Sequence, residues 1–244
     1  MSTERTAQLR RALSPTTLRR AWEFPPAFLR IVWLLLLAGG LALAIWAAID
    51  DHFPGDIAVG RWLQDHDPGG QPLIDFFRNV GSSQAAVVTI AVIFAFLSLT
   101  RRRRMAFVVL GLVLALVLQT VLKEAVDRPR TSVLFLDQRT SFDSPSFPSG
   151  HAMSSITVGA TLLYLVWRLP GLPLPRLAVG AWALGLALLT PWVSITGGVH
   201  WPSDVLGGLV WATIFLAPFL VGMEWARSAD LALGPDARGP DPPA

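Results

Sequence analysis

Three short segments of the chain carry the residue types that can hold an anion and move a proton. They combine cations, histidines and a carboxylate with residues that begin a helix or turn the backbone. They lie at residues 123–130 (Lys123, Arg128, Arg130), 147–151 (Ser149, Gly150, His151) and 197–204 (His200, Asp204). Brought together, such side chains could bind a phosphate group and transfer it.

The second segment has the features of a helix N-terminus. Pro148 cannot continue a helix backwards, Ser149 is a favoured N-cap, and an apolar run follows His151. The free N–H groups and positive dipole end of such a helix bind anions, and Gly150 lets a phosphate approach the backbone closely. A cap alone would explain Pro148 and Ser149, but not a histidine in the first turn of a membrane helix, where ionisable groups are rare.

In the third segment His200 and Asp204 are four residues apart. If Pro202 begins a helix, the carboxylate lies about one turn beyond the histidine and can reach a ring nitrogen. A carboxylate held on one imidazole nitrogen selects the tautomer and raises the basicity of the other, which suits a nucleophile attacking phosphorus. The same pair could instead ligate a metal ion, or Ser203 and Asp204 could simply cap the helix.

Together the segments divide the work of phosphoryl transfer. Lysine and arginine would neutralise the non-bridging oxygens, backbone N–H groups would orient them, and one histidine would attack while another protonates the leaving oxygen. His52 and His66 have no comparable neighbours, so His151 and His200 are the candidates. No carboxylate cluster suited to Mg²⁺ is evident, which predicts a metal-independent site with no cofactor. No Gly-x-Ser-x-Gly pattern supports a Ser-His-Asp hydrolase built on Ser149.

The elements that must position these segments are long apolar helices. Of the 244 residues, 52% are hydrophobic and 15% charged, against roughly 25% charged in soluble domains. Six apolar stretches span about 26–33 Å each as helices, which matches a hydrocarbon core of about 30 Å. We therefore expect an all-α bundle of six transmembrane helices, at residues 28–49, 80–100, 105–122, 151–167, 177–196 and 202–223.

Composition excludes several other classes. The chain has no cysteine, so disulfides, thiolate metal sites and cysteine nucleophiles are ruled out. The net charge of +3 is small and its cations sit between apolar runs, so no nucleic-acid partner is expected. The first apolar run is too long for a cleavable signal peptide.

Arginines concentrate at one end of the predicted spans. They precede the first span, fill the turn at residues 101–104, and bracket the next turn at Arg168 and Arg176. This excess predicts that this side, with both termini, is cytoplasmic. The first opposite loop, residues 50–79, is acidic, and its residues 57–65 and 72–79 could form short interfacial helices. We predict a cytoplasmic arm at residues 1–27, the six-span domain at 28–225 and a flexible cytoplasmic tail at 226–244.

The span count places all three segments at the extracytoplasmic end. Lys123, Arg128, Arg130 and Arg139 follow the third span there and break the charge rule. Snorkelling to lipid headgroups explains a single cation. Four cations within 17 residues, beside histidines from other spans, indicate a site instead.

These residues resemble the three signature blocks of the type 2 phosphatidic acid phosphatase (PAP2) superfamily, the lipid phosphate phosphatases related to vanadium haloperoxidases. The blocks read Lys-x6-Arg-Pro, Pro-Ser-Gly-His and Ser-Arg-x5-His-x3-Asp. The resemblance covers about residues 28–223. It implies a six-span helical bundle with phosphate on Lys123, Arg130, Ser149 and the Gly150 backbone. It further implies His151 as general acid, His200 as the nucleophile that forms a phosphohistidine, and Asp204 as its partner.

The chain departs from the blocks in two places. Thr131 replaces the proline of the first block, and Val193-Ser194 replaces the Ser-Arg pair of the third. A neutral hydrogen bond from serine would be weaker than an arginine contact by about 1–2 kcal/mol. We expect Arg128 or Arg139 to reach into the position of the missing arginine, so that removing it lowers turnover far more than removing Arg104.

The expected function is a membrane lipid phosphatase acting on a lipid phosphomonoester or pyrophosphate at the outer leaflet of a bacterial cytoplasmic membrane. Undecaprenyl diphosphate, phosphatidic acid and phosphatidylglycerol phosphate are candidate substrates. A lipid phosphotransferase would use the same site, and the lost arginine favours a non-catalytic lipid-binding protein. A vanadate-dependent oxidase is a remote third reading. The sequence does not indicate an oligomeric state.

Overall fold

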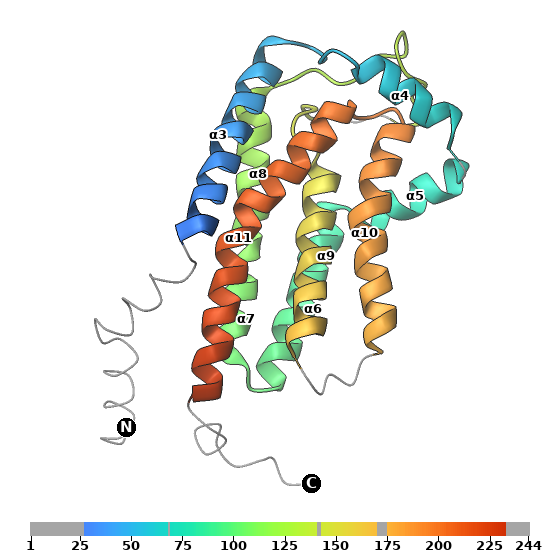
Figure 1. Ribbon diagram of the computed structural model, residues 1–244. Helices are drawn as coiled ribbons and strands as arrows, with labels where there is room; N and C mark the ends of the chain where they lie inside the picture. Colours follow the sequence, from blue (N-terminus) through green and yellow to red (C-terminus); the bar gives the residue numbers. More distant parts are fainter. Residues whose placement is uncertain (1–26, 68, 141–142, 170–174, 233–244) are drawn as a thin grey trace.

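All regular secondary structure in the residues that the structure describes is α-helical. The computed structural model describes residues 27–67, 69–140, 143–169 and 175–232, shown in Figure 1. The helices are α3 (Ala27–Ile49), α4 (Asp56–Asp65), α5 (Gly70–Val80), α6 (Ser83–Leu99), α7 (Arg103–Leu110), α8 (Leu112–Val126), α9 (Gly150–Arg168), α10 (Arg176–Thr196) and α11 (Pro202–Ala232).

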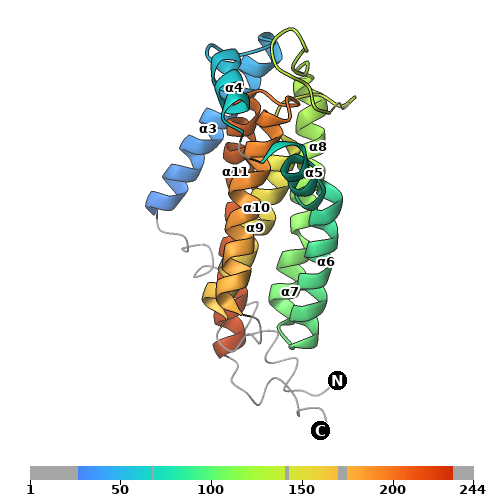
Figure 2. The ribbon, with the colours of Figure 1, turned by 90° about the vertical axis from the view of Figure 1, so that its right-hand side faces the viewer.

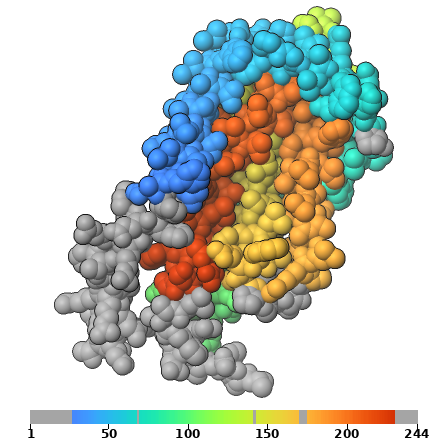
Figure 3. All heavy atoms as spheres, in the orientation of Figure 1, coloured from blue at the N-terminus to red at the C-terminus, as the bar shows by residue number. Residues whose placement is uncertain are grey.

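The long helices form a bundle around α9. Helix α9 packs against α10, α11 and α6, and Figures 1 and 2 show the long helices running side by side, with α4 and α5 across one end. In the view of Figure 3, residues between α3 and α5 cover that end of the bundle. We call it the capped end. The short helices predicted in the acidic loop are confirmed as α4 and α5.

The outward faces of the bundle are apolar. Leucine, valine and tryptophan side chains on α3, α6, α8 and α10 are exposed, among them Leu99 at 84% and Leu177 at 87%. Exposed apolar surface on this scale is typical of a lipid-facing helix rather than of a helix in water. The structure therefore supports a multi-pass membrane protein.

Four helical stretches are long and apolar enough to cross a membrane: α3, α7 with α8, α10 and α11. A fifth is added if α5 and α6, bent by 49° at their junction, count as one span. Helix α9, the fourth predicted span, is not among them. Helix α9 is more polar than these four, and its polar side chains lie inside the bundle: Ser154, Ser155, Thr157 and Thr161 are buried. The count of six spans thus stays a prediction.

The predicted end of the six-span domain differs from the end of the last helix. Helix α11 continues to Ala232, so the predicted domain end at residue 225 lies inside a helix. This continuation has its own anchor, because Glu224 accepts a hydrogen bond from Tyr164 at 2.9 Å and pairs with Arg227. The arm at residues 1–26 and the tail from 233 lie outside the described residues.

Candidate active site

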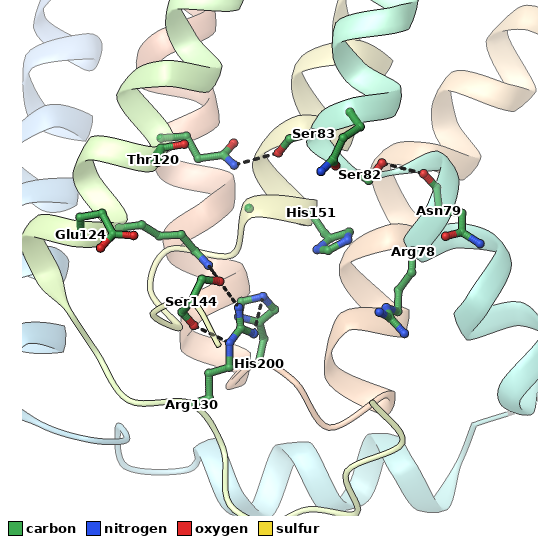
Figure 4. A pocket seen from close by; sticks show the side chains of 14 residues that line it. Arg78, Asn79, Ser82, Ser83, Thr120, Glu124, Arg130, Ser144, His151 and His200 are labelled. Carbon is green, nitrogen blue, oxygen red and sulfur yellow. Dashed lines mark hydrogen bonds between the residues drawn. The ribbon is translucent and has the colours of Figure 1, made fainter. Parts of the chain in front are cut away.

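A cavity of about 520 Å³ lies at the capped end between α5, α6, α8, α9 and the loops beside them. Its walls include residues of all three segments that the sequence singled out. Those residues are Lys123, Arg130, Gly150, His151 and His200. Figure 4 shows His151, His200 and Arg130 pointing toward the same space. Segments separated by up to 77 positions, from Lys123 to His200, therefore meet at one cavity.

His200 is held by a different partner on each ring nitrogen. Its Nδ1 lies 3.4 Å from Oδ2 of Asp204, and its Nε2 lies 3.4 Å from a guanidinium nitrogen of Arg130. Since a carboxylate accepts, Nδ1 carries the proton and Nε2 is left unprotonated, next to Arg130 on the cavity wall. The ring is 1% exposed.

Asp204 is a fully buried carboxylate in the first turn of α11. It accepts hydrogen bonds from Arg128 at 2.7 Å, from the backbone N–H of Trp201 at 2.8 Å and from the hydroxyl of Ser146. A buried carboxylate with this many donors stays ionised and keeps a fixed orientation. Asp204 can therefore orient His200 and stabilise positive charge on its ring.

Arg128 does not line the cavity, contrary to its predicted role in binding phosphate. Its guanidinium is buried behind the histidine, where it binds Asp204, Ser203 at 2.8 Å and Asp56 at 3.4 Å, and lies 4.6 Å from the ring centroid of Phe53. Asp56, in α4, also accepts from the backbone N–H of Ser203 at 2.8 Å. The carboxylates of Asp204 and Asp56 hold Arg128 away from the cavity, where it fixes Asp204 behind His200.

Lys123 and Arg130 form the cationic wall of the cavity. The ammonium of Lys123 donates to the carbonyl of Pro145 at 2.5 Å, and Arg130 donates to the carbonyls of Ser144 at 2.7 Å and Val199 at 2.9 Å. With these contacts Arg130 lies 3.4 Å from Nε2 of His200, and Lys123 lines the same cavity. The spacing of the first block thus brings two cations to one place because Lys123 lies in the last turn of α8 while Arg130 follows in the loop.

The second segment begins α9 as predicted. The hydroxyl of Ser149 accepts from the backbone N–H of Ala152 at 3.4 Å, so Ser149 is the N-cap and lies behind the cavity rather than on its wall. Gly150 and His151 face the cavity. A β-carbon on Gly150 would lie 2.8 Å from Nε2 of Gln119, so this position has little room for a side chain.

Burial changes the charge state of the groups around the nucleophile candidate. It lowers the pKa of His200 to about 3, and the Arg130 guanidinium acts in the same direction while Asp204 opposes it. The ring is therefore neutral near pH 7, as a nucleophile must be. Burial also lowers the pKa of Arg130, to about 10, which leaves the guanidinium charged near pH 7.

Neither arginine expected to replace the missing one reaches the cavity. Arg139 pairs with Asp67 at 2.6 Å and with Asp137 at 3.5 Å, and Arg128 is occupied as described. Ser194 is buried in α10, where its hydroxyl donates to the carbonyl of Thr190 at 2.8 Å. The expectation for Arg128 and Arg139 is not supported by this geometry.

The sequence interpretation missed Arg78, which also lines the cavity. It lies in α5, within the stretch 72–79 that was predicted only as an interfacial helix. One signal could have found it, since Arg78 is one of only two arginines in the acidic loop at residues 50–79. A cation in an acidic loop that the sequence predicts to be extracytoplasmic departs from the charge rule as Arg128 and Arg130 do.

Comparisons with known proteins agree with this architecture. The family model of the PAP2 superfamily matches residues 104–228, just over half of the chain. Phosphatidylglycerophosphatase B of Bacillus subtilis (strain 168) is 39% identical over 92 residues, which cover 37% of this chain and 44% of that protein. The match thus spans less than half the length of that curated relative.

Two solved structures share the fold. The crystal structure of a transmembrane PAP2-type phosphatidylglycerolphosphate phosphatase from Bacillus subtilis superposes with a TM-score of 0.63 at 23% identity, covering 83% of this chain and 98% of that one. The structure of Aquifex aeolicus LpxE superposes with a TM-score of 0.50 at 24% identity, covering 69% and 96%.

Fold and cavity define an all-helical, multi-pass membrane protein with a cationic, two-histidine cavity at one end of the bundle. The chain belongs to the PAP2 superfamily.

Proposed function

We propose that this protein is a lipid phosphatase that hydrolyses a phosphomonoester or pyrophosphate on a membrane lipid. The observation that carries the proposal is the geometry of His200, which lines the cavity with Nε2 next to Arg130 while Asp204, fixed by Arg128, holds Nδ1. The family membership and the matches in sequence and in structure to Bacillus subtilis phosphatidylglycerophosphate phosphatase support the same class of reaction. The substrate for which these relatives are named makes phosphatidylglycerol phosphate the first compound to test, followed by phosphatidic acid and undecaprenyl diphosphate.

The residues of the cavity fit a two-step, metal-independent mechanism. Lys123, Arg130 and the N–H groups at the start of α9 would hold the non-bridging oxygens. Nε2 of His200 attacks phosphorus, and the bond to the leaving oxygen breaks as His151 gives that oxygen a proton. Asp204 stabilises the positive charge that the phosphohistidine ring acquires. Water, losing a proton to His151, then attacks the phosphohistidine and releases inorganic phosphate.

The location of the cavity fits a lipid substrate. It lies at one end of apolar helices, next to the level at which lipid headgroups sit, so a headgroup phosphate could enter while its acyl chains stay in the bilayer. We place this end outside the cytoplasm, because the arginine-rich turn at residues 101–104 is at the other end. Within this proposal the chain crosses the membrane six times, with both termini in the cytoplasm.

Two other functions share this site. A phosphotransferase would follow the same first step and pass the phosphate from His200 to another lipid hydroxyl. A non-catalytic lipid-binding protein is favoured by one observation, the burial of Ser194 away from the cavity in place of the third-block arginine.

One experiment separates these functions. Purified protein in detergent is offered the three lipid phosphates with EDTA present, and phosphate release is compared with that of His200→Ala. We expect release by the wild type and a loss of at least about 1,000-fold in the variant, as for removal of other catalytic nucleophiles. Phosphate release that survives in His200→Ala rules out His200 as the nucleophile. Loss of wild-type activity in EDTA would favour a metal held by His200 and Asp204, and transfer to an added lipid alcohol would indicate the phosphotransferase.

A further inference from the structure

The cavity has a cationic residue on the side away from Lys123 and Arg130. Among the residues that line it, Arg78 is the only other arginine or lysine in the described part of the chain. Figure 4 shows Arg78 across the cavity from Arg130, with His151 and His200 between them. An anion at the histidines would therefore have positive charge on both sides.

Apolar packing fixes the helix that carries this arginine. Ile74 and Phe77 of α5 form a buried cluster with Val193 of α10, and the packing is also close at Gly197, where an added β-carbon would lie 3.3 Å from Ile74. Helix α5 is therefore seated on the last turn of α10. Arg78 follows Phe77 in α5, and this packing places it at the cavity.

The same turn of α10 is where the third block departs from the family pattern. Val193 is the apolar contact for α5, and the neighbouring Ser194 accepts the backbone N–H of His200 on its carbonyl at 3.3 Å. Position 194 is therefore next to the nucleophile candidate, and α5 packs on the residue before it. The replacement of the Ser-Arg pair by Val193-Ser194 removes one cation from this turn. It also provides Val193 as the apolar surface for α5, the helix that carries Arg78.

Arg78 also lies close to the second histidine. The ring of His151 and the backbone of Arg78 are neighbours at the cavity. The guanidinium itself has a distant ion-pair partner, Asp75 at 3.9 Å, whose own side chain is 53% exposed. An ion pair of this length contributes little to stability.

From these contacts we propose that Arg78 binds a non-bridging oxygen of the phosphate under attack and supplies the cation that position 194 lacks. The inference rests on the proposed lipid phosphatase function. Arg78, Lys123 and Arg130 then form a three-cation cradle matched to a dianionic phosphate, and the planar guanidinium can bind two of its oxygens. Helix α5 also lies next to the ring of His151.

The test compares Arg78→Gln with Arg61→Gln, an exposed arginine of α4 that does not line the cavity and donates to the carbonyl of Phe135. Affinity for orthovanadate, measured by calorimetry on the purified protein, and kcat/KM for the best lipid phosphate are determined for both. We expect Arg78→Gln to lower each by about 10- to 100-fold, the size of a lost charge-assisted hydrogen bond. We expect Arg61→Gln to match the wild type.

A second pair of variants tests whether the charge is the cause. In the Arg78→Gln background, Ser194→Arg should recover at least about threefold of the lost vanadate affinity, because it returns a cation to the neighbouring turn. Arg78→Lys keeps the positive charge but lacks the planar guanidinium that can bind two oxygens, so it should retain an intermediate vanadate affinity. It is also the variant to use if Arg78→Gln does not fold. Wild-type vanadate affinity in Arg78→Gln, or in Arg78→Lys where only that variant folds, overturns the inference.

The outcomes separate this inference from the proposed function. If the wild type releases phosphate and His200→Ala does not, but Arg78→Gln is unchanged, only the role of Arg78 fails. If the wild type neither releases phosphate nor binds vanadate, the phosphatase function itself fails, and the role of Arg78 fails with it.

Discussion

At the scale of single residues, the site depends on a buried group of charges behind the nucleophile candidate. Arg128 contacts both Asp204 and Asp56, and all three side chains are almost completely buried. Such a group is stable only when complete, because removing one partner leaves a buried charge without compensation. Arg128 therefore belongs to the support of His200 even though it does not reach the cavity.

We expect Arg128→Gln to reduce stability by about 3–5 kcal/mol and to abolish activity. The comparison variant is Arg139→Gln, because Arg139 pairs with Asp67 at 2.6 Å but its own side chain is 25% exposed, so that water can partly replace it and the loss of stability should be smaller. Thermal unfolding in detergent measures both. A melting temperature for Arg128→Gln as high as that of Arg139→Gln would show that the buried pair with Asp204 is not required.

The lowered pKa of His200 predicts how stability depends on pH. Below about pH 6.5 the histidine of the unfolded chain binds a proton that the folded chain does not bind until about pH 3. Stability is therefore fully present above pH 6.5 and falls with decreasing pH, by up to about 1.4 kcal/mol per pH unit from this group.

The measurement is the drop in melting temperature between pH 7.5 and 4.5. It should be smaller in His200→Gln, which has no titrating ring, than in the wild type. The control His66→Gln, at an exposed position, should keep the full wild-type drop. Identical drops in wild type and His200→Gln would argue against a buried, neutral ring.

At the scale of elements, close helix packing positions the start of α9. Phe147 precedes the Ser149 cap and is buried against Gly207 of α11, where an added β-carbon would lie 2.2 Å from the phenyl ring. The ring cannot move without displacing the loop that leads to His151. Gly207 is therefore needed both for the packing of α11 and for the position of the loop that leads to His151.

We expect Gly207→Ala to lower the melting temperature and the activity, because the added methyl overlaps a buried ring and overpacking of this kind costs about 1–3 kcal/mol. Gly180→Ala is the control, since Gly180 is also helical but has nothing within 4 Å of the added carbon. In that variant the better helix propensity of alanine should leave stability equal or slightly higher. The idea fails if the two variants behave alike.

At the scale of the whole molecule, the proposed topology requires the capped end to face outward and the 101–104 turn to face the cytoplasm. The absence of native cysteine makes this directly measurable, because one introduced cysteine is the only thiol. Val133, at the capped end, is 72% exposed, and Arg103 is exposed at the other end.

A membrane-impermeant maleimide added to intact cells should label Val133→Cys and should leave Arg103→Cys unlabelled until the cells are permeabilised. Both variants lie away from the cavity, so phosphatase activity serves as the control for folding. The reverse labelling pattern would place the cavity on the cytoplasmic side and contradict the proposed orientation.

Much of this protein could be predicted from sequence because the deciding signals are local. Apolar run length indicated the helices, and the acidic loop yielded α4 and α5 within one or two residues of their predicted bounds. Proline, serine and glycine before His151 indicated the start of α9. Counting spans predicted that Lys123, Arg130, His151 and His200 lie at the same end, since the loops between successive spans alternate between the two ends of a bundle.

Only the tertiary structure decided which cations face the cavity, because that depends on the partners each one meets. Arg128 and Arg130 are two residues apart, yet Asp204 and Asp56 hold the first away from the cavity while backbone carbonyls aim the second at it. Arg78 is at the cavity because Ile74 and Phe77 pack on Val193, more than 110 positions along the chain. Local spacing can predict a helix and its cap, but long-range packing selects the side chains that surround an anion.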